Sequence, residues 1–229
     1  MSDNGPILVF RNVTVAAGGE WDCGIRNATF ELGAGEILLL RLEPGRTRIP
    51  LADAAGGLAG RPEGAVSFMG EDWQSMSPDR AAACRGRIGR VFESRGWISN
   101  LDIDENVTLS QRYHRSRPLC EIVEEAEALA REFGLPGLPK ARRTEVPLHD
   151  LRRAEWVRAF LGGPDLIILE RPTRDVRPEG VPALAGAVRA ALDRGAAVIC
   201  TVGNEGGAPD VAPVVCREYA MRGPELVPL

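Results

Sequence analysis

The feature that most constrains this chain is an apolar run that leads into a glycine-containing loop and then into a small-residue helix. The apolar run spans Glu36–Leu42, the loop is Arg41–Pro50, and the helix is predicted over Leu51–Leu58. A run without polar alternation is typical of a strand covered on both faces of its sheet. A strand, a tight loop and a helix start form a geometry that can cradle phosphates, but the residues that would do so are absent here.

Further apolar runs indicate that this strand belongs to a parallel sheet. Buried strands are predicted over Leu166–Leu169 and Ala196–Val202, with a helix over Val181–Arg194 between them. The chain is helical in character from about Pro78 to Leu135. The other predicted elements are strands over 7–16, 27–32, 65–69 and 89–92, helices over 79–84, 120–133 and 152–161, a loop over 136–150, and a hairpin of 214–216 with 219–221. This alternation predicts an α/β fold with a helical insertion.

The composition excludes several classes of protein. A formal net charge of −4 argues against a nucleic-acid partner held mainly by electrostatics. Five cysteines without a CxxC pair, and only two histidines, argue against a disulfide framework and a zinc or multi-histidine site. No apolar run approaches the ~18 residues of a membrane span, so we expect a soluble protein of a reducing cytoplasm. Clustered arginines, among them Arg87 and Arg90, are interpreted as solvated charge, although they could hold an anion.

The order of landmarks along residues 7–222 resembles the nucleotide-binding subunit of ABC transporters. The landmarks are Asn27–Phe30, Gly35–Ile37, Gly56–Leu58, Gly64–Gly70, Arg87–Phe92, Asn100–Leu109, Arg158–Pro164 and Leu166–Thr173. No single segment is specific, but their succession at the family's spacing is. Val91–Phe92 and Gly96–Leu101, with Tyr113 and His114 after them, look most like the ATPase subunits of lipid-trafficking importers of the MCE type.

This resemblance implies a P-loop NTPase-like core with a parallel sheet, an antiparallel β subdomain and an inserted helical subdomain. Residues 1–229 would form a single nucleotide-binding-like domain. The core and β subdomain would occupy about residues 1–92 and 160–229, and the helical subdomain about residues 93–159. The activity that the family implies is ATP hydrolysis with Mg²⁺.

The phosphate loop of the family is altered in this chain. Of its three glycines, one is kept at Gly45, and another falls on Thr47. The phosphate-binding lysine falls on Arg48, whose planar fork is not equivalent to a compact ammonium group. The hydroxyl that ligates Mg²⁺ falls on Ile49, which is followed by Pro50, and an apolar side chain cannot ligate a hard cation.

The residues that the family uses beyond this loop are altered as well. The metal-associated aspartate falls on Glu170, and the general-base glutamate falls on Arg171, which cannot accept a proton. The glutamine that senses Mg²⁺ falls on Glu93. Trp21 is a candidate for the adenine-stacking aromatic, with structural packing as the alternative.

The two remaining motifs of the family also lack their defining residues. The signature that binds the opposite subunit's γ-phosphate falls on Val146–Asp150, or on Leu148–Leu151 after a two-residue shift, without its glycines. The switch histidine should follow Thr201, where Val202–Asn204 stand. Loss of several such groups together makes ATP turnover unexpected, since removing a general base alone costs roughly 10²–10⁴-fold in rate.

These substitutions lead to the hypothesis of a degenerate ABC subunit, a pseudo-ATPase on the inner face of the cell membrane. It would dock on a membrane permease and pair with a second ABC ATPase subunit, either another copy or a competent one. ATP would bind weakly if at all, and Mg²⁺ binding is not expected. In the family, the groove beside the glutamine loop receives the permease, and the corresponding residues here are Glu93, Trp97, Ile98, Asn100 and Asn106.

Two alternatives stay open at the level of sequence. The first is a divergent but active ATPase that uses Arg48 for phosphate and Glu170 for Mg²⁺. The second is a scaffold or regulatory protein that associates with no transporter.

Overall fold

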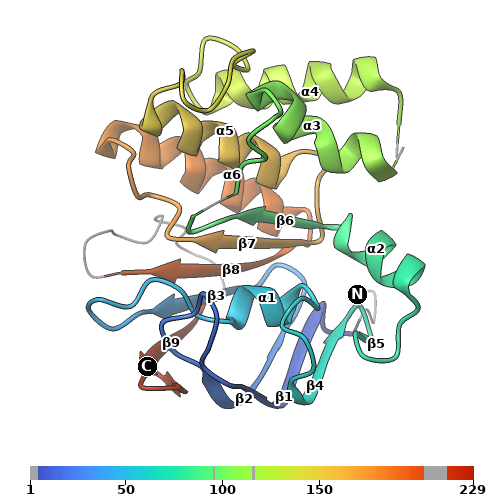
Figure 1. The fold of residues 1–229 in the computed structure, drawn as a ribbon, viewed down its shortest axis with the longest axis vertical. Coiled ribbons are helices and arrows are strands. Elements are labelled where there is room, and N and C mark those ends of the chain that lie inside the picture. The colour runs from blue at the N-terminus through green and yellow to red at the C-terminus, as the bar shows by residue number, and fades with distance from the viewer. Residues whose placement is uncertain (1–4, 95, 115–116, 204–215) are drawn as a thin grey trace.

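The computed structural model describes residues 5–94, 96–114, 117–203 and 216–229, which form two sheets flanked by helices (Figure 1). The strands are β1 (Leu8–Val15), β2 (Ile25–Leu32), β3 (Ile37–Arg41), β4 (Glu63–Phe68), β5 (Glu71–Asp72), β6 (Ile88–Val91), β7 (Leu166–Glu170), β8 (Ala197–Val202), β9 (Cys216–Arg222) and β10 (Glu225–Pro228). The helices are α1 (Leu51–Ala55), α2 (Pro78–Arg85), α3 (Ile103–His114), α4 (Leu119–Glu132), α5 (Leu148–Phe160) and α6 (Val181–Asp193), with a short 3-10 turn η1 (Pro178–Gly180).

The larger sheet carries the candidate site. Its strand order is β10-β9-β3-β8-β7-β6, parallel throughout except for β10, which pairs antiparallel with β9 at one edge. The smaller sheet, β2-β1-β4-β5, is antiparallel. The fold therefore has the parallel core, antiparallel sheet and inserted helices that the resemblance implied, and the predicted fold class is confirmed.

The lack of polar alternation in β3 follows from its position between two hydrophobic cores. Ile37 and Leu39 point into the core beneath α3 to α6, whereas Leu38 and Leu40 point into the core shared with the antiparallel sheet and α1. Successive side chains of a strand lie on opposite faces, so a strand covered on both faces must be apolar at every position. The apolar run that predicted this strand is thus explained by packing.

The inserted helices form a layer beyond the β6 edge of the sheet in Figure 1. The centre of this layer is Trp156 of α5, which is fully buried and packs edge-to-face against Phe133. Its indole N–H donates to the carbonyl oxygen of Pro172 at 3.0 Å, which ties the helical layer to the segment after β7. A buried Trp with a satisfied N–H both fills volume and fixes orientation.

Two predicted helix bounds need correction. Helix α1 ends at Ala55 and not at Leu58, because Gly56 and Gly57 follow it and Gly57 has a left-handed φ of 65°. Helix α5 begins at Leu148, so the end of the predicted loop 136–150 is helical. Each bound lies next to a residue that breaks regular structure, Gly56 after the end of α1 and Pro147 before the start of α5.

The C-terminal hairpin lies further along the chain than predicted. It pairs β9 with β10 through a turn at Gly223, whose φ is 58°, so Tyr219–Met221 is part of its first strand and not its second. Val214 and Val215, predicted to form the first strand, lie outside the described residues. Within the described part of the chain, no helix is both long and apolar enough to cross a membrane.

Candidate functional site

The carboxyl ends of β3, β6 and β7 lie at one edge of the parallel sheet, and residues predicted from sequence stand at or just after these ends. Loop 42–50 follows β3, Glu93 follows β6, and Glu170 ends β7. Ligands of parallel α/β sheets bind at this edge, in the space outside the strand ends. The candidate site is therefore the space between loop 42–50 and the ends of β6 and β7.

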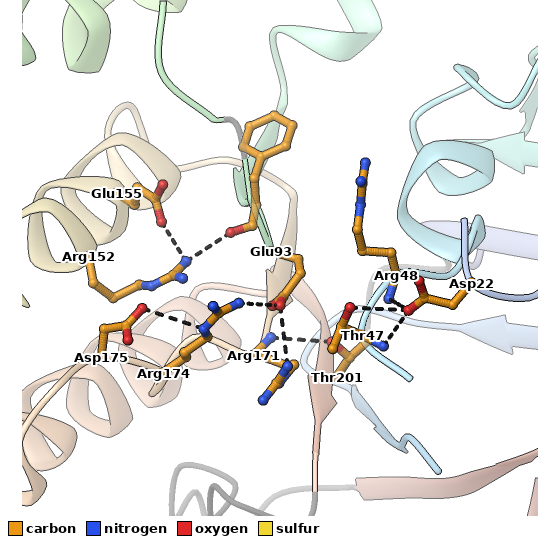
Figure 2. Close-up of polar contacts among 11 residues, drawn as sticks. Asp22, Thr47, Arg48, Glu93, Arg152, Glu155, Arg171, Arg174, Asp175 and Thr201 are labelled. Atoms are coloured by element: carbon orange, nitrogen blue, oxygen red, sulfur yellow. Dashed lines mark hydrogen bonds and ion pairs between the residues drawn. The ribbon is translucent and has the colours of Figure 1, made fainter. Parts of the chain in front are cut away.

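The backbone of the predicted phosphate loop is bonded to a carboxylate of the same chain. Thr47 and Arg48 donate their N–H groups to Oδ2 of Asp22 at 2.7 and 2.8 Å, and the Thr47 hydroxyl donates to the same oxygen at 3.1 Å (Figure 2). The Asp22 N–H in turn donates to the Arg48 carbonyl oxygen at 2.9 Å. The hydrogen bond from the Thr47 N–H is the largest cause of a lowered Asp22 pKa, so this carboxylate is ionised at neutral pH.

The two residues before Asp22 also contact the loop and the helix after it. Glu20 forms an ion pair with the guanidinium of Arg48. The indole N–H of Trp21 donates to Oδ2 of Asp53, in α1, at 2.9 Å. Trp21, the candidate for adenine stacking, is thus held against α1 by a hydrogen bond, and its part in nucleotide binding stays a prediction.

Arg90 of β6 connects the predicted metal-associated residue to α1. Its Nε lies 2.8 Å from Oε2 of Glu170, and its Nη1 lies 2.6 Å from Oδ1 of Asp53. Burial raises the pKa of Glu170, and the charge of Arg90 opposes that rise. Burial alone would lower the pKa of Arg90, but the Glu170 and Asp53 carboxylates outweigh it and raise that pKa. Arg90 is thus a partly buried ion-pair partner and not a solvated charge.

Glu93, at the predicted glutamine position, is buried and accepts from two arginines. Its Oε1 lies 3.3 Å from Nη1 of Arg171 and 2.5 Å from Nη1 of Arg174 (Figure 2). Arg171 has a left-handed φ of 45°, and its backbone N–H donates to the carbonyl oxygen of Thr201 at 3.0 Å. The predicted base position therefore carries a cation that is held against Glu93.

The space among these groups is a cavity of about 220 Å³. Its lining includes Trp21, Arg48, Asp53, Arg90, Glu93 and Glu170. Each of the charged groups in that lining contacts a group of opposite charge. Among the residues that the structure describes, no cluster of three or more His, Cys, Asp or Glu side chains forms a metal site.

The residues predicted to receive a partner differ in accessibility. Ile98 is 45% exposed and Asn100 is also exposed, whereas Trp97 is partly buried and packs against the Arg158 guanidinium. Asn106 is only 4% exposed, and its amide bonds the Ile98 backbone at 2.8 and 3.1 Å. Glu93 is buried as well. Asn106 therefore supports the loop from beneath, Glu93 is buried against Arg171 and Arg174, and the other three residues can present a surface.

The predicted signature lies at the start of α5. Both alignments of that motif, Val146–Asp150 and Leu148–Leu151, place polar and apolar side chains there without a glycine, and Leu148 is 67% exposed. Val202 ends β8 beside Gly203, while Asn204 lies outside the described residues. A helix start that lacks glycine keeps its backbone N–H groups further from any ligand, because each Cβ blocks close approach.

Sequence reasoning missed Asp22 and the pairing of Arg90 with Glu170. Asp22 stands next to the predicted Trp21, but no local motif marks it, since its partners lie 25 and 26 residues away. Arg90 and Glu170 are 80 residues apart and meet only because β6 and β7 are neighbours in the sheet. For Arg90 and Glu170 the available signal was their position near the carboxyl ends of β6 and β7, and no such signal marks Asp22.

Comparisons with known proteins identify relatives in sequence. No family model matches the chain. It is 30% identical over 149 residues to a probable anion import ATP-binding protein of Haloferax volcanii, and the matched region covers 59% of this chain and 51% of that protein. It is 25% identical to the intermembrane phospholipid transport ATP-binding protein MlaF of Escherichia coli, over 72% of this chain and 61% of MlaF. A phosphonates import ATP-binding protein of Hyphomonas neptunium is 28% identical, over 86% of this chain and 77% of that protein.

Solved structures show the same fold. A dimeric ATP-binding cassette in a post-hydrolysis state with ADP and Pi superposes with a TM-score of 0.80 over 96% of both chains, at 19% identity. An ATP-binding subunit of an ABC transporter gives a TM-score of 0.78 at 17% identity, over 96% of this chain and 88% of that one.

The match to the first two relatives in sequence is partial: it spans about half of the Haloferax protein and 61% of MlaF. The resemblance predicted from sequence is nonetheless confirmed, and a lipid-transport protein is among the matches.

Proposed function

We propose that this chain, whose fold and sequence relatives are those of ATP-binding subunits of ABC transporters, is a catalytically degenerate subunit that does not turn over ATP. It acts as a structural or regulatory component on the inner face of a membrane, docked on a permease and paired with a second cassette subunit. The relatives are described as ATP-binding proteins of import and transport systems, which supports the transporter setting.

The observation that carries this proposal is the ion pair between Arg90 and Glu170. Glu170 stands where the family holds its metal-associated carboxylate, and the Arg90 Nε lies 2.8 Å from it. A guanidinium at this distance satisfies the carboxylate and repels a divalent cation. The charge that Mg²⁺ would supply is thus already present as a fixed arginine, which cannot deliver a bound water or polarise a phosphoryl oxygen as a metal does.

The other residues of the site do not fit a Mg²⁺ ion either. Ile49, at the position of the hydroxyl ligand, is 3% exposed and packs in the core, and the next residue is Pro50. A hard cation requires oxygen ligands, which neither side chain can offer. Since Mg²⁺ supplies several kcal/mol of transition-state stabilisation in such reactions, its exclusion alone would slow turnover severely.

The position of the general base gives independent support. Arg171 stands there, and its guanidinium lies 3.3 Å from Glu93. A guanidinium is protonated at every physiological pH and cannot take a proton from an attacking water. Glu93 cannot readily replace it, because its carboxylate is buried and accepts from both Arg171 and Arg174. We infer a further rate loss of roughly 10²–10⁴-fold from the missing base.

The proposal is tested by measuring Mg·ATP binding and phosphate release with the purified chain. We expect no Mg²⁺-dependent phosphate release above background, because Arg90 pairs with the metal-associated carboxylate of Glu170 and Arg171 occupies the base position. The dimeric cassette whose structure holds ADP and Pi in a post-hydrolysis state, assayed in parallel, provides a positive control for the assay. Phosphate release by this chain that depends on Mg²⁺ and saturates with ATP would contradict the proposal and favour a divergent active ATPase.

Docking on a permease is tested through Ile98, the most exposed apolar residue of the predicted docking loop. A tagged form of the chain, expressed in its native cells and purified in mild detergent, should retain a multi-span membrane protein. Ile98→Asp should no longer retain that protein, because docking would bury the new carboxylate at the interface without a partner of opposite charge. The matched control is Leu119→Asp, at an exposed leucine at the start of α4 that belongs to none of the predicted motifs.

Retention by the control and loss by Ile98→Asp would support the docking loop. If Ile98→Asp kept the membrane protein as well as the unmodified chain does, the docking site would have to lie elsewhere. If no membrane protein were retained in any form, a transporter-independent scaffold would be the better description.

A further inference from the structure

Three consecutive residues, Glu20, Trp21 and Asp22, lie across the predicted phosphate loop, and we call them the strap. Each uses its side chain on a different part of the loop or of α1: the Arg48 guanidinium, the Asp53 carboxylate, and the backbone N–H groups of Thr47 and Arg48. The strap is also joined to the loop through its backbone, by the Asp22 N–H on the Arg48 carbonyl. These contacts occupy the donors of Thr47 and Arg48 in the loop.

The chemistry of the Asp22 contact is that of a bound anion. Two successive backbone N–H groups converge on one carboxylate oxygen at 2.7 and 2.8 Å, and the Thr47 hydroxyl adds a third donor at 3.1 Å. Successive N–H groups in a loop form a concave donor site of the kind that holds phosphate oxygens. In this chain the oxygen comes from Asp22.

Glu20 pairs with the cationic side chain of the loop, just as Asp22 accepts from its backbone. Its carboxylate pairs with the Arg48 guanidinium, the cation that stands where the family has its phosphate-binding lysine. Glu20 and Asp22 therefore satisfy both kinds of donor, side-chain and backbone, that a phosphate-bearing ligand would need. They also place two negative charges at the loop. A phosphate ligand, which is itself negatively charged, would therefore be repelled in addition to finding its donors occupied.

We propose that the strap is an autoinhibitory contact, in which the carboxylates of Glu20 and Asp22 occupy the donors of loop 42–50 and exclude phosphate-bearing ligands. The proposal rests on the proposed function and extends it, because it explains why the donors of the loop stay occupied in a subunit that does not turn over ATP. A phosphate must displace a carboxylate that is tethered to the same chain, and tethering gives an effective concentration in the millimolar range or above.

The test measures the binding of inorganic pyrophosphate, without Mg²⁺, to the full chain and its variants by calorimetric titration and by the shift of the thermal midpoint. Asp22→Ala removes the internal anion and frees the N–H groups of Thr47 and Arg48. We expect the variant to bind pyrophosphate at least about tenfold more tightly than the unmodified chain, and its thermal midpoint to rise accordingly with pyrophosphate. Asp22→Leu, which keeps the approximate size of the side chain but offers no acceptor, serves if the alanine variant does not fold.

The matched control is Asp72→Ala. Asp72 also accepts a backbone N–H through its carboxylate, from Gln74 at 2.9 Å, but in a turn of the antiparallel sheet. This control should bind pyrophosphate as the unmodified chain does, which separates release of the loop from a general loss of negative charge.

Equal pyrophosphate affinity in the unmodified chain and in both Asp22 variants would overturn the strap proposal. So would tight binding by the unmodified chain, because its loop would then be open already. These results are distinct from a failure of the proposed function, which would show as Mg²⁺-dependent ATP hydrolysis by the unmodified chain, whatever the Asp22 variants bind.

Discussion

Replacing Arg90 with methionine is expected to lower the free energy of unfolding by about 3–5 kcal/mol, the range for breaking a buried ion pair from one side. Methionine keeps the length of the side chain but leaves the buried Glu170 carboxylate, and the half-buried Asp53, without a cation. Urea denaturation followed by circular dichroism measures the change. The loss should shrink as the pH is lowered, because the carboxyl of Glu170, raised in pKa by burial, then folds in its neutral form.

The double variant Arg90→Met with Glu170→Leu is the control for this prediction. A buried ion pair replaced by apolar residues of similar volume is often neutral in stability, so we expect the double variant to recover most of the loss. If the double variant were as unstable as the sum of the two single variants, the pair would not interact in the way the structure indicates.

Replacing Trp156 with alanine is expected to destabilise the chain by about 3–5 kcal/mol, the range for emptying a large aromatic site in a core. Trp156 is fully buried among the inserted helices, and its loss also leaves the Pro172 carbonyl without its donor. The midpoint of urea denaturation should fall with little change in its slope. Trp156→Phe, which keeps much of the volume, should cost less.

Tyr113→Ala provides the matched surface control for this second prediction. Tyr113 is an aromatic residue of the same helical layer but is 72% exposed, so its truncation should change stability by no more than about 0.5 kcal/mol. Similar losses in Trp156→Ala and Tyr113→Ala would contradict the assignment of Trp156 to the centre of that layer.

The two largest effects lie in different parts of the molecule for a physical reason. Trp156 stabilises the helical layer through volume and apolar contact, whereas Arg90 holds two acidic groups at the strand ends, where polar groups meet at the border of the core. The charge network around Arg90 connects β6, β7 and α1, the elements that border the candidate site.

The fold class could be predicted from sequence because the signals for it are local. The run Glu36–Leu42 is apolar at every position that packs, and it became β3 between two cores. Helix α6 was predicted over 181–194 and spans Val181–Asp193, since its apolar face repeats at helical spacing. The predicted bounds of helices and strands were wrong where a single residue sets the end of the element, as Gly57 does after α1 and Gly223 does in the hairpin.

The candidate site could be predicted only in part. The sequence by itself determined which residue types stand at the loop and strand ends, such as Arg48, Ile49 and Arg171, and the family resemblance led us to expect that a hydroxyl ligand and a base are missing there. Only the tertiary structure decided which groups these site residues contact. Asp22 accepts from the backbone N–H groups of the loop, and Arg90 forms an ion pair with Glu170. The physical reason is that such contacts join segments tens of residues apart, whose meeting depends on strand order and not on any local pattern.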